Sequence, residues 1–71
     1  MVKATKVTNN IRALRAATGD MTQADLADRI GVTRQTIIAI EQGRYSPSLE
    51  VAFQIAREFR VPLDDVFHYG G

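Results

Sequence analysis

The sequence predicts a single all-α domain of five helices, and three features of its 71 residues point to that class. Apolar residues recur at spacings of three and four, as in amphipathic helices, and no stretch sustains the alternation that is typical of strands. Helix N-cap residues precede these patterns, and glycine or proline follows most of them. A chain of this length supports one small core, so we expect modest stability.

The first helix is predicted over residues 9–18. Thr8 or Asn9 can cap its start, and Gly19 can end it. One face of this helix is apolar and is formed by Ile11, Leu14 and Ala17. Residues 1–8 are expected to be a flexible N-terminal arm, because short polar termini are seldom ordered.

The second and third helices are predicted between clear start and stop signals. Thr22 can cap the second helix, Asp25 completes a shortened capping box, and Gly31 ends the helix. Thr33 can cap the third helix and Gly43 ends it. The inward stripe of the third helix is formed by Ile37, Ile40 and part of Ile38.

The fourth helix is predicted over residues 49–59, after a loop in which Pro47 prevents an earlier start. Ser46 or Ser48 can cap it. Its expected core face consists of Leu49, Ala52, Ile55, Ala56 and Phe59. A short fifth helix is expected over residues 63–67. The single domain therefore spans residues 9–69, and residues 70–71 form a tail.

Composition excludes several classes of protein. The chain has no cysteine, which excludes disulfides and thiolate metal sites and favours a reducing compartment. The longest unbroken aliphatic run, Ile37 to Ile40, is far too short for a membrane span, and the N-terminus lacks the apolar segment of a signal peptide. We therefore expect a cytoplasmic protein without a membrane partner.

Charge is distributed unevenly although the net charge is only +1. Residues 1–44 carry seven of the nine Lys and Arg but four of the eight Asp and Glu, a balance of +3, which leaves −2 for residues 45–71. One end of the domain is therefore cationic, a distribution that suits a polyanion but also occurs on ordinary solvated surfaces.

Residues 23–42 fit two helices that cross steeply through a short turn, which is the helix-turn-helix unit. Ala27 is small enough for the helix crossing, and Gly31 tolerates the positive φ of the turn. The positions that must face the core are all aliphatic: Leu26, Ile30, Val32, Ile37 and Ile40. The alternative is a generic two-helix hairpin in a small bundle.

Three segments carry a resemblance to a known family: "IRALR", "TQADLADRIGVTRQTIIAIEQGRYSPSL" and "IAREFRVPLDDVF". With these segments, residues 9–69 resemble the phage-repressor-like, or Xre-like, helix-turn-helix family. The resemblance implies a lambda-repressor-like domain of five helices that binds double-stranded DNA, usually as a homodimer, with the third helix in the major groove. One departure is the extra residue in "GDMTQ", most simply Asp20, which falls in a loop.

The resemblance, together with side-chain chemistry, implies the residues that contact bases. Arg34 can donate two hydrogen bonds to guanine, Gln35 can pair with adenine, and a threonine methyl can touch thymine. The candidates for base contact are Thr33, Arg34, Gln35, Thr36 and Ala39, with Ala39 offering only close approach. The plainer alternative is that Thr33 only caps the helix while Arg34 and Gln35 are solvated.

Phosphate contacts are implied for residues on either side of the third helix. Gln23 opens the second helix, where a helix N-terminus favours phosphate, and it is expected to brace the glutamine or arginine of the third helix. The candidates are Gln23, Gln42, Arg44, Tyr45 and Arg12, with Arg44 the strongest and Arg12 weakened by the insertion. Lys3 and Lys6 lie in the arm, for which we favour disorder over DNA contact.

Two further assignments follow from the resemblance. Arg15 is expected to pair with Glu41 as a structural tie between the first helix and the helix-turn-helix unit. The apolar C-terminal group is expected to form the dimer interface, with intramolecular packing on the fourth helix as its alternative. The interface residues are Val61, Pro62, Leu63, Phe67 and Tyr69, while Val66 is expected inside.

The sequence therefore predicts a sequence-specific transcriptional repressor that binds a palindromic operator as a homodimer. An antitoxin that binds and neutralises a toxin, or a restriction-modification controller protein, are the alternatives. No catalytic constellation, metal-ligand spacing or phosphate loop is present in the sequence, so we expect no enzyme, no cofactor and no small-molecule ligand.

Overall fold

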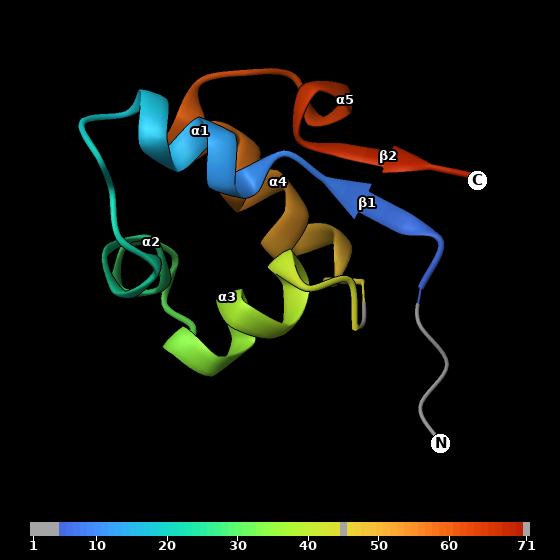
Figure 1. Cartoon of the computed structure of the whole chain (residues 1–71), viewed down its shortest axis with the longest axis horizontal. Helices are drawn as coiled ribbons and strands as arrows, with labels where there is room; N and C mark the ends of the chain where they lie inside the picture. The colour runs from blue at the N-terminus through green and yellow to red at the C-terminus, as the bar shows by residue number, and fades with distance from the viewer. Residues whose placement is uncertain (1–4, 45, 71) are drawn as a thin grey trace.

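Five helices and a two-stranded antiparallel sheet form the computed structural model, which describes residues 5–44 and 46–70 (Figure 1). The elements in chain order are β1 (Val7–Asn9), α1 (Ile11–Ala17), α2 (Gln23–Ile30), α3 (Arg34–Glu41), α4 (Leu49–Phe59), α5 (Leu63–Val66) and β2 (Phe67–Tyr69). The five-helix class predicted from the sequence is confirmed. No helix in the described ranges is long and apolar enough to cross a membrane.

The ends of α2 and α3 follow from side-chain capping. The Thr22 hydroxyl accepts the Asp25 N–H at 2.9 Å, and the Asp25 carboxylate accepts the Thr22 N–H at 3.1 Å, which completes the capping box. The Thr33 hydroxyl accepts the Thr36 N–H at 3.2 Å. Gly31 ends α2 at a φ of 75°, a conformation that glycine adopts without steric cost. Local chemistry therefore fixes both helices of the helix-turn-helix unit.

The predicted core face of α4 is wrong at one residue, Leu49. Leu49 is 72% exposed, whereas the Val51 side chain packs against the core. Leu49 and Val51 flank the buried face of α4 on opposite sides, and the neighbouring elements cover only the side of Val51. Of the two serines considered as caps, Ser48 accepts the Val51 N–H at 3.2 Å.

The small sheet was not expected from the sequence. Val7 pairs with Tyr69, Thr8 with His68 and Asn9 with Phe67, so strands occupy the end of the expected arm and the end of the domain (Figure 1). Residues 1–4 lie outside the described residues. Strands of three residues are too short to show alternation, and their pairing depends on contacts between distant parts of the chain.

The core lies between the helices and contains side chains from every one of them. Six side chains are essentially fully buried: Ile11, Leu26, Ile37, Ile40, Ile55 and Val66. Ala27 is 3% exposed at the α2–α3 crossing, as its size predicts. Met21, from the loop between α1 and α2, is also buried. Ala17, at the end of α1, is exposed and does not join this core. The burial of Ile37 and Ile40 in this core fixes the orientation of α3.

Candidate nucleic-acid interface

Helix α3 has one buried face and one face that is open to solvent. Ile37 and Ile40 anchor it to the core, while Thr33, Arg34 and Gln35 are exposed. Thr36 and Ala39 are half-buried on the side between these faces. In Figure 1, α3 lies at the lower edge of the molecule, away from α5 and β2. The first turn of α3 is therefore accessible to a large, flat or grooved partner.

The hydroxyl groups of Thr33 and Thr36 are partly occupied within the helix. Their oxygens lie 3.0 Å apart and share a hydrogen bond, and the Thr33 oxygen also accepts the Thr36 N–H. Each hydroxyl has only one hydrogen to donate. Arg34 and Gln35 make no side-chain hydrogen bond among those found in the described part of the chain. Most of the hydrogen-bond donors that this turn can offer to a partner therefore belong to Arg34 and Gln35.

An open groove runs between α1, α2 and α3. Its wall includes side chains from all three helices and from the loop that joins α1 to α2, among them Arg12, Asp20, Gln23, Arg34 and Gln42. The complete lining contains three guanidinium groups, three side-chain amides and two carboxylates. The structure thus brings Arg12, which the sequence assigns a weaker role, into one groove with Gln23 and Gln42, two other candidates for phosphate contact.

The Asp20 insertion is accommodated by backbone conformation. Gly19 and Asp20 both adopt positive φ, 63° and 56° respectively. Aspartate tolerates this left-handed region better than most residues. The extra residue is therefore absorbed in the loop, and Ile11 of α1 remains fully buried.

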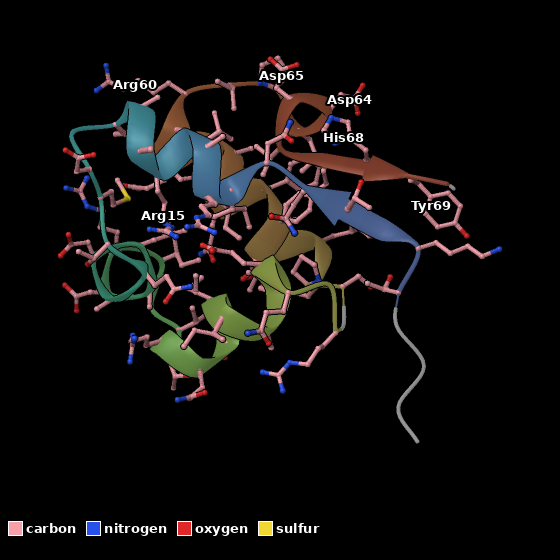
Figure 2. All side chains as sticks on the ribbon, viewed as in Figure 1. Arg15, Arg60, Asp64, Asp65, His68 and Tyr69 are labelled. Carbon is pink, nitrogen blue, oxygen red and sulfur yellow. The ribbon has the colours of Figure 1, made fainter. Side chains whose placement is uncertain are left out.

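Glu41 is the centre of a polar network in the wall of the groove. The Arg15 guanidinium donates to both Glu41 oxygens, at 2.8 Å from Nε and 3.0 Å from Nη2. The Arg15 and Glu41 side chains are only 15% and 9% exposed. Arg15 also donates to the Met21 carbonyl at 2.9 Å. Figure 2 shows Arg15 extending from α1 toward α3, so this pair ties α1, the following loop and α3 together.

Gln23 lies in the same network but with a different partner from the one expected. Its Nε2 donates to Glu41 Oε1 at 3.3 Å, rather than bracing Arg34 or Gln35. An amide nitrogen carries two N–H groups. The second N–H is therefore available to an acceptor in the groove, as a phosphate contact requires.

The loop after α3 is held by a Schellman motif. The Gly43 N–H donates to the Ile40 carbonyl at 3.0 Å, and the Arg44 N–H donates to the Ala39 carbonyl at 3.1 Å. Gly43 has a φ of 71°, which this motif requires of its left-handed residue. The Arg44 side chain is exposed beyond the end of α3. Tyr45, the neighbouring candidate, lies outside the described residues.

Asn9, which the sequence predicts only as a helix cap, also contacts α3. Its Oδ1 accepts the Ile11 N–H at 3.1 Å, and its Nδ2 donates to the Ile40 carbonyl at 2.9 Å. No local pattern signals the second bond, because the two residues are 31 positions apart. The end of α3 is thereby linked to β1.

The C-terminal apolar group divides between the core and the surface. Val66 is fully buried, while Val61, Leu63 and Phe67 are half-buried against the core. Pro62 is exposed and Tyr69 is 80% exposed. The expected intramolecular packing is therefore present, and part of the apolar group remains exposed to solvent.

Comparisons with known proteins agree with this geometry. The chain is 52% identical over 61 residues to an uncharacterised HTH-type transcriptional regulator, MJ0272, of Methanocaldococcus jannaschii, covering 86% of this chain and 91% of the relative. It is 46% identical to the uncharacterised HTH-type transcriptional regulator YgzD of Bacillus subtilis, covering 83% and 88%. It is 36% identical to the cryptic phage CTXphi transcriptional repressor RstR of Vibrio cholerae, covering 82% of this chain and 51% of RstR.

A solved structure has the same fold. The crystal structure of a proposed DNA-binding protein from Bacteroides fragilis matches with a TM-score of 0.74 at 22% identity, over 87% of this chain and 98% of that one. A family described as helix-turn-helix matches residues 11–66, which include α1 to α5. The chain therefore belongs to the phage-repressor-like helix-turn-helix family.

Proposed function

We propose that this protein is a sequence-specific DNA-binding transcriptional repressor that acts as a homodimer on a palindromic operator. The observation that carries the proposal is the first turn of α3, where Arg34 and Gln35 are exposed on a helix whose opposite face is locked in the core. A rigid helix that presents these side chains suits readout of base edges in the major groove.

The groove beside α3 supports a phosphate-binding role. Arg12 and Arg34 line it, Gln23 has one N–H to spare, and Arg44 follows at the far end of α3. Contacts to phosphates on both sides of a reading helix fix its register on the duplex. We therefore assign Gln23, Gln42, Arg44 and Arg12 to phosphate and Thr33, Arg34, Gln35, Thr36 and Ala39 to base edges.

Repression and dimerisation rest on separate observations. The relative from Vibrio cholerae is by name a transcriptional repressor. The exposed Pro62 and Tyr69 adjoin the half-buried Val61, Leu63 and Phe67, which together offer an apolar surface to a second copy. A dimer with twofold symmetry favours an operator of the same symmetry.

Selection of bound sites from random duplex DNA tests the proposal. We expect a palindromic site whose half-site centres are about one helical turn, ~34 Å, apart. The control is the double variant Arg34→Ala, Gln35→Ala, which should remain folded and enrich no site. If the wild-type protein also enriches no site, sequence-specific recognition is wrong, and a protein-binding role such as that of an antitoxin replaces it.

A further inference from the structure

We propose that Asn9 is a positioning residue for DNA binding, which sets the loop after α3 so that Arg44 meets the phosphate chain. The inference rests on the proposed DNA-binding function and assigns a role to a residue outside the helix-turn-helix unit. Asn9 lies at the end of β1, yet its side chain reaches the last turn of α3.

The Ile40 carbonyl is the point through which Asn9 acts. It accepts the Asn9 Nδ2 at 2.9 Å and the Gly43 N–H at 3.0 Å. A carbonyl oxygen has two lone pairs, so the Asn9 amide and the Gly43 N–H can both bond to it. Asn9 therefore fixes the acceptor of one of the two hydrogen bonds that define the Schellman turn, and Arg44 supplies the donor of the other bond.

Asn9 itself is held from two sides, which gives it the rigidity to position another group. Its Oδ1 accepts the Ile11 N–H at 3.1 Å, and its backbone pairs with Phe67 in the sheet. Asn9 is half-buried and also lines the groove that contains Arg12 and Gln42. The Asn9 side-chain amide therefore links the sheet to the part of the molecule that holds the candidate phosphate contacts.

Asn10, which directly follows β1, offers a matched control. Its Nδ2 donates to the Asp65 carbonyl at 3.1 Å, so it ties the strand to α5 and not to α3. Both residues are asparagines that bond a helix carbonyl across a large sequence distance. A general loss of stability should follow from changing either one, whereas an effect on the Arg44 loop should follow only from changing Asn9.

The variant Asn9→Asp separates the two hydrogen bonds of Asn9. A carboxylate can still accept the Ile11 N–H but cannot donate to the Ile40 carbonyl. We expect binding to weaken roughly 3- to 10-fold on every DNA sequence, and the log-log salt slope to fall by about one as the Arg44 contact is lost. Asn10→Asp should leave the slope unchanged.

A double-variant comparison decides whether Asn9 acts through Arg44. The neutral variant Asn9→Ser is used here, because a carboxylate at residue 9 would also repel phosphates in the groove. In an Arg44→Ala background, Asn9→Ser should weaken binding almost no further, whereas in an Arg34→Ala background it should weaken binding as much as it does in the wild type. Equal costs in all backgrounds would overturn the inference. An absence of DNA binding by the wild-type protein would instead overturn the proposed function, so the two failures can be told apart.

Asn9→Ser covers the case in which the aspartate variant does not fold. Its hydroxyl can accept the Ile11 N–H in the same local turn but is too short to reach Ile40. Circular dichroism gives the folded fraction, and amide exchange reports the loop directly. We expect faster exchange at Gly43 in Asn9→Ser but not in Asn10→Asp, and unchanged exchange at Gly43 in Asn9→Ser would contradict the role.

Discussion

Arg34 and Arg44 lie at opposite ends of α3 and are both exposed, yet their chemistry toward DNA should differ. Arg34 is the first residue of the helix, and in the proposed docking its guanidinium group faces base edges. Arg44 follows the helix, and in the same proposed docking it contacts only the sugar-phosphate chain. Replacing Arg34 therefore tests the sequence specificity of DNA binding, and replacing Arg44 tests its sequence-independent affinity.

Arg34→Ala should cost ~1 to 3 kcal/mol of binding free energy on the selected site, because a bidentate contact to guanine is lost. The cost should be much smaller on unrelated DNA, so the variant should lose the preference for guanine at one base pair of the site. Binding isotherms on both DNAs at one salt concentration measure this difference. Equal weakening on all sequences, or none, would contradict placement of α3 in the major groove.

Arg44→Ala should weaken binding about equally on every sequence and reduce the log-log salt slope by about one. Neither arginine lies on an apolar stripe, so circular dichroism should show both variants folded. A loss confined to the selected site would show that Arg44 reads bases, and its assignment to phosphate would then be wrong.

At the scale of the helices, the tie between α1 and α3 is the most buried charge interaction found in the described residues. Arg15→Ala or Glu41→Ala leaves the other charge poorly matched, so each should lower stability by roughly 2 kcal/mol, or about 10 °C in Tm. The double replacement should recover part of this loss. Thermal unfolding followed by circular dichroism measures each variant.

The ion pair between Arg29 and Glu58 is the matched control for that tie. It joins α2 to α4 at 3.1 Å, but its side chains are 55% and 28% exposed. Glu58→Ala should therefore cost less than about 1 kcal/mol. If the Arg15 and Glu41 variants are no less stable than Glu58→Ala, the tie makes no special contribution to the fold.

The capping box of α2 should make stability depend on pH. The hydrogen bonds from the Thr22 backbone and side chain lower the pKa of Asp25 from its ordinary value of 3.8. A lowered folded-state pKa means that the stabilisation is present above the unfolded pKa and is lost as pH falls through the folded one. The stability difference between wild type and Asp25→Asn should therefore shrink below about pH 4. A difference that is constant from pH 6 to pH 2 would contradict this.

The helices were predictable where a local signal marks each end. Thr22, Gly31 and Thr33 fixed the limits of α2 and the start of α3, because caps and positive φ depend on neighbouring residues alone. Leu49 shares the helical phase of buried residues, but periodicity carries no information about how far the surrounding elements extend. The second bond of Asn9 was not predictable for a similar reason, since it depends on packing between distant segments.

At the scale of the whole molecule, the C-terminal apolar surface should control assembly. Tyr69 is 80% exposed, so Tyr69→Glu should leave the fold intact while weakening the dimer about tenfold or more. Operator binding should weaken with it, whereas binding to a single half-site should not. Sedimentation at micromolar concentration measures the dimer.

Leu49→Ser is the control for the dimer. Leu49 is a second exposed apolar side chain, 72% accessible, but it lies on α4 outside the predicted interface. It should leave sedimentation unchanged. A wild-type protein that sediments as a monomer and selects a single asymmetric half-site would contradict the dimer as a whole.

The pairing of β1 with β2 brings the two ends of the segment 8–68 together. Thr8 and His68 are direct partners in the sheet and both are exposed, although about sixty residues separate them in the chain. Opposite residues in antiparallel strands lie at the Cα spacing that a disulfide spans. Because the sequence contains no cysteine, Thr8→Cys with His68→Cys would introduce one unambiguous cross-link.

Covalent closure of that segment should act mainly on the unfolded chain. Restricting a loop of this length removes entropy worth up to roughly 4 kcal/mol, so the oxidised variant should unfold at a markedly higher temperature than the same protein after reduction. The increase should disappear when a thiol reductant is added. Identical unfolding temperatures before and after reduction, with the disulfide verified by mass, would mean that the strands are already joined by other contacts in the denatured ensemble.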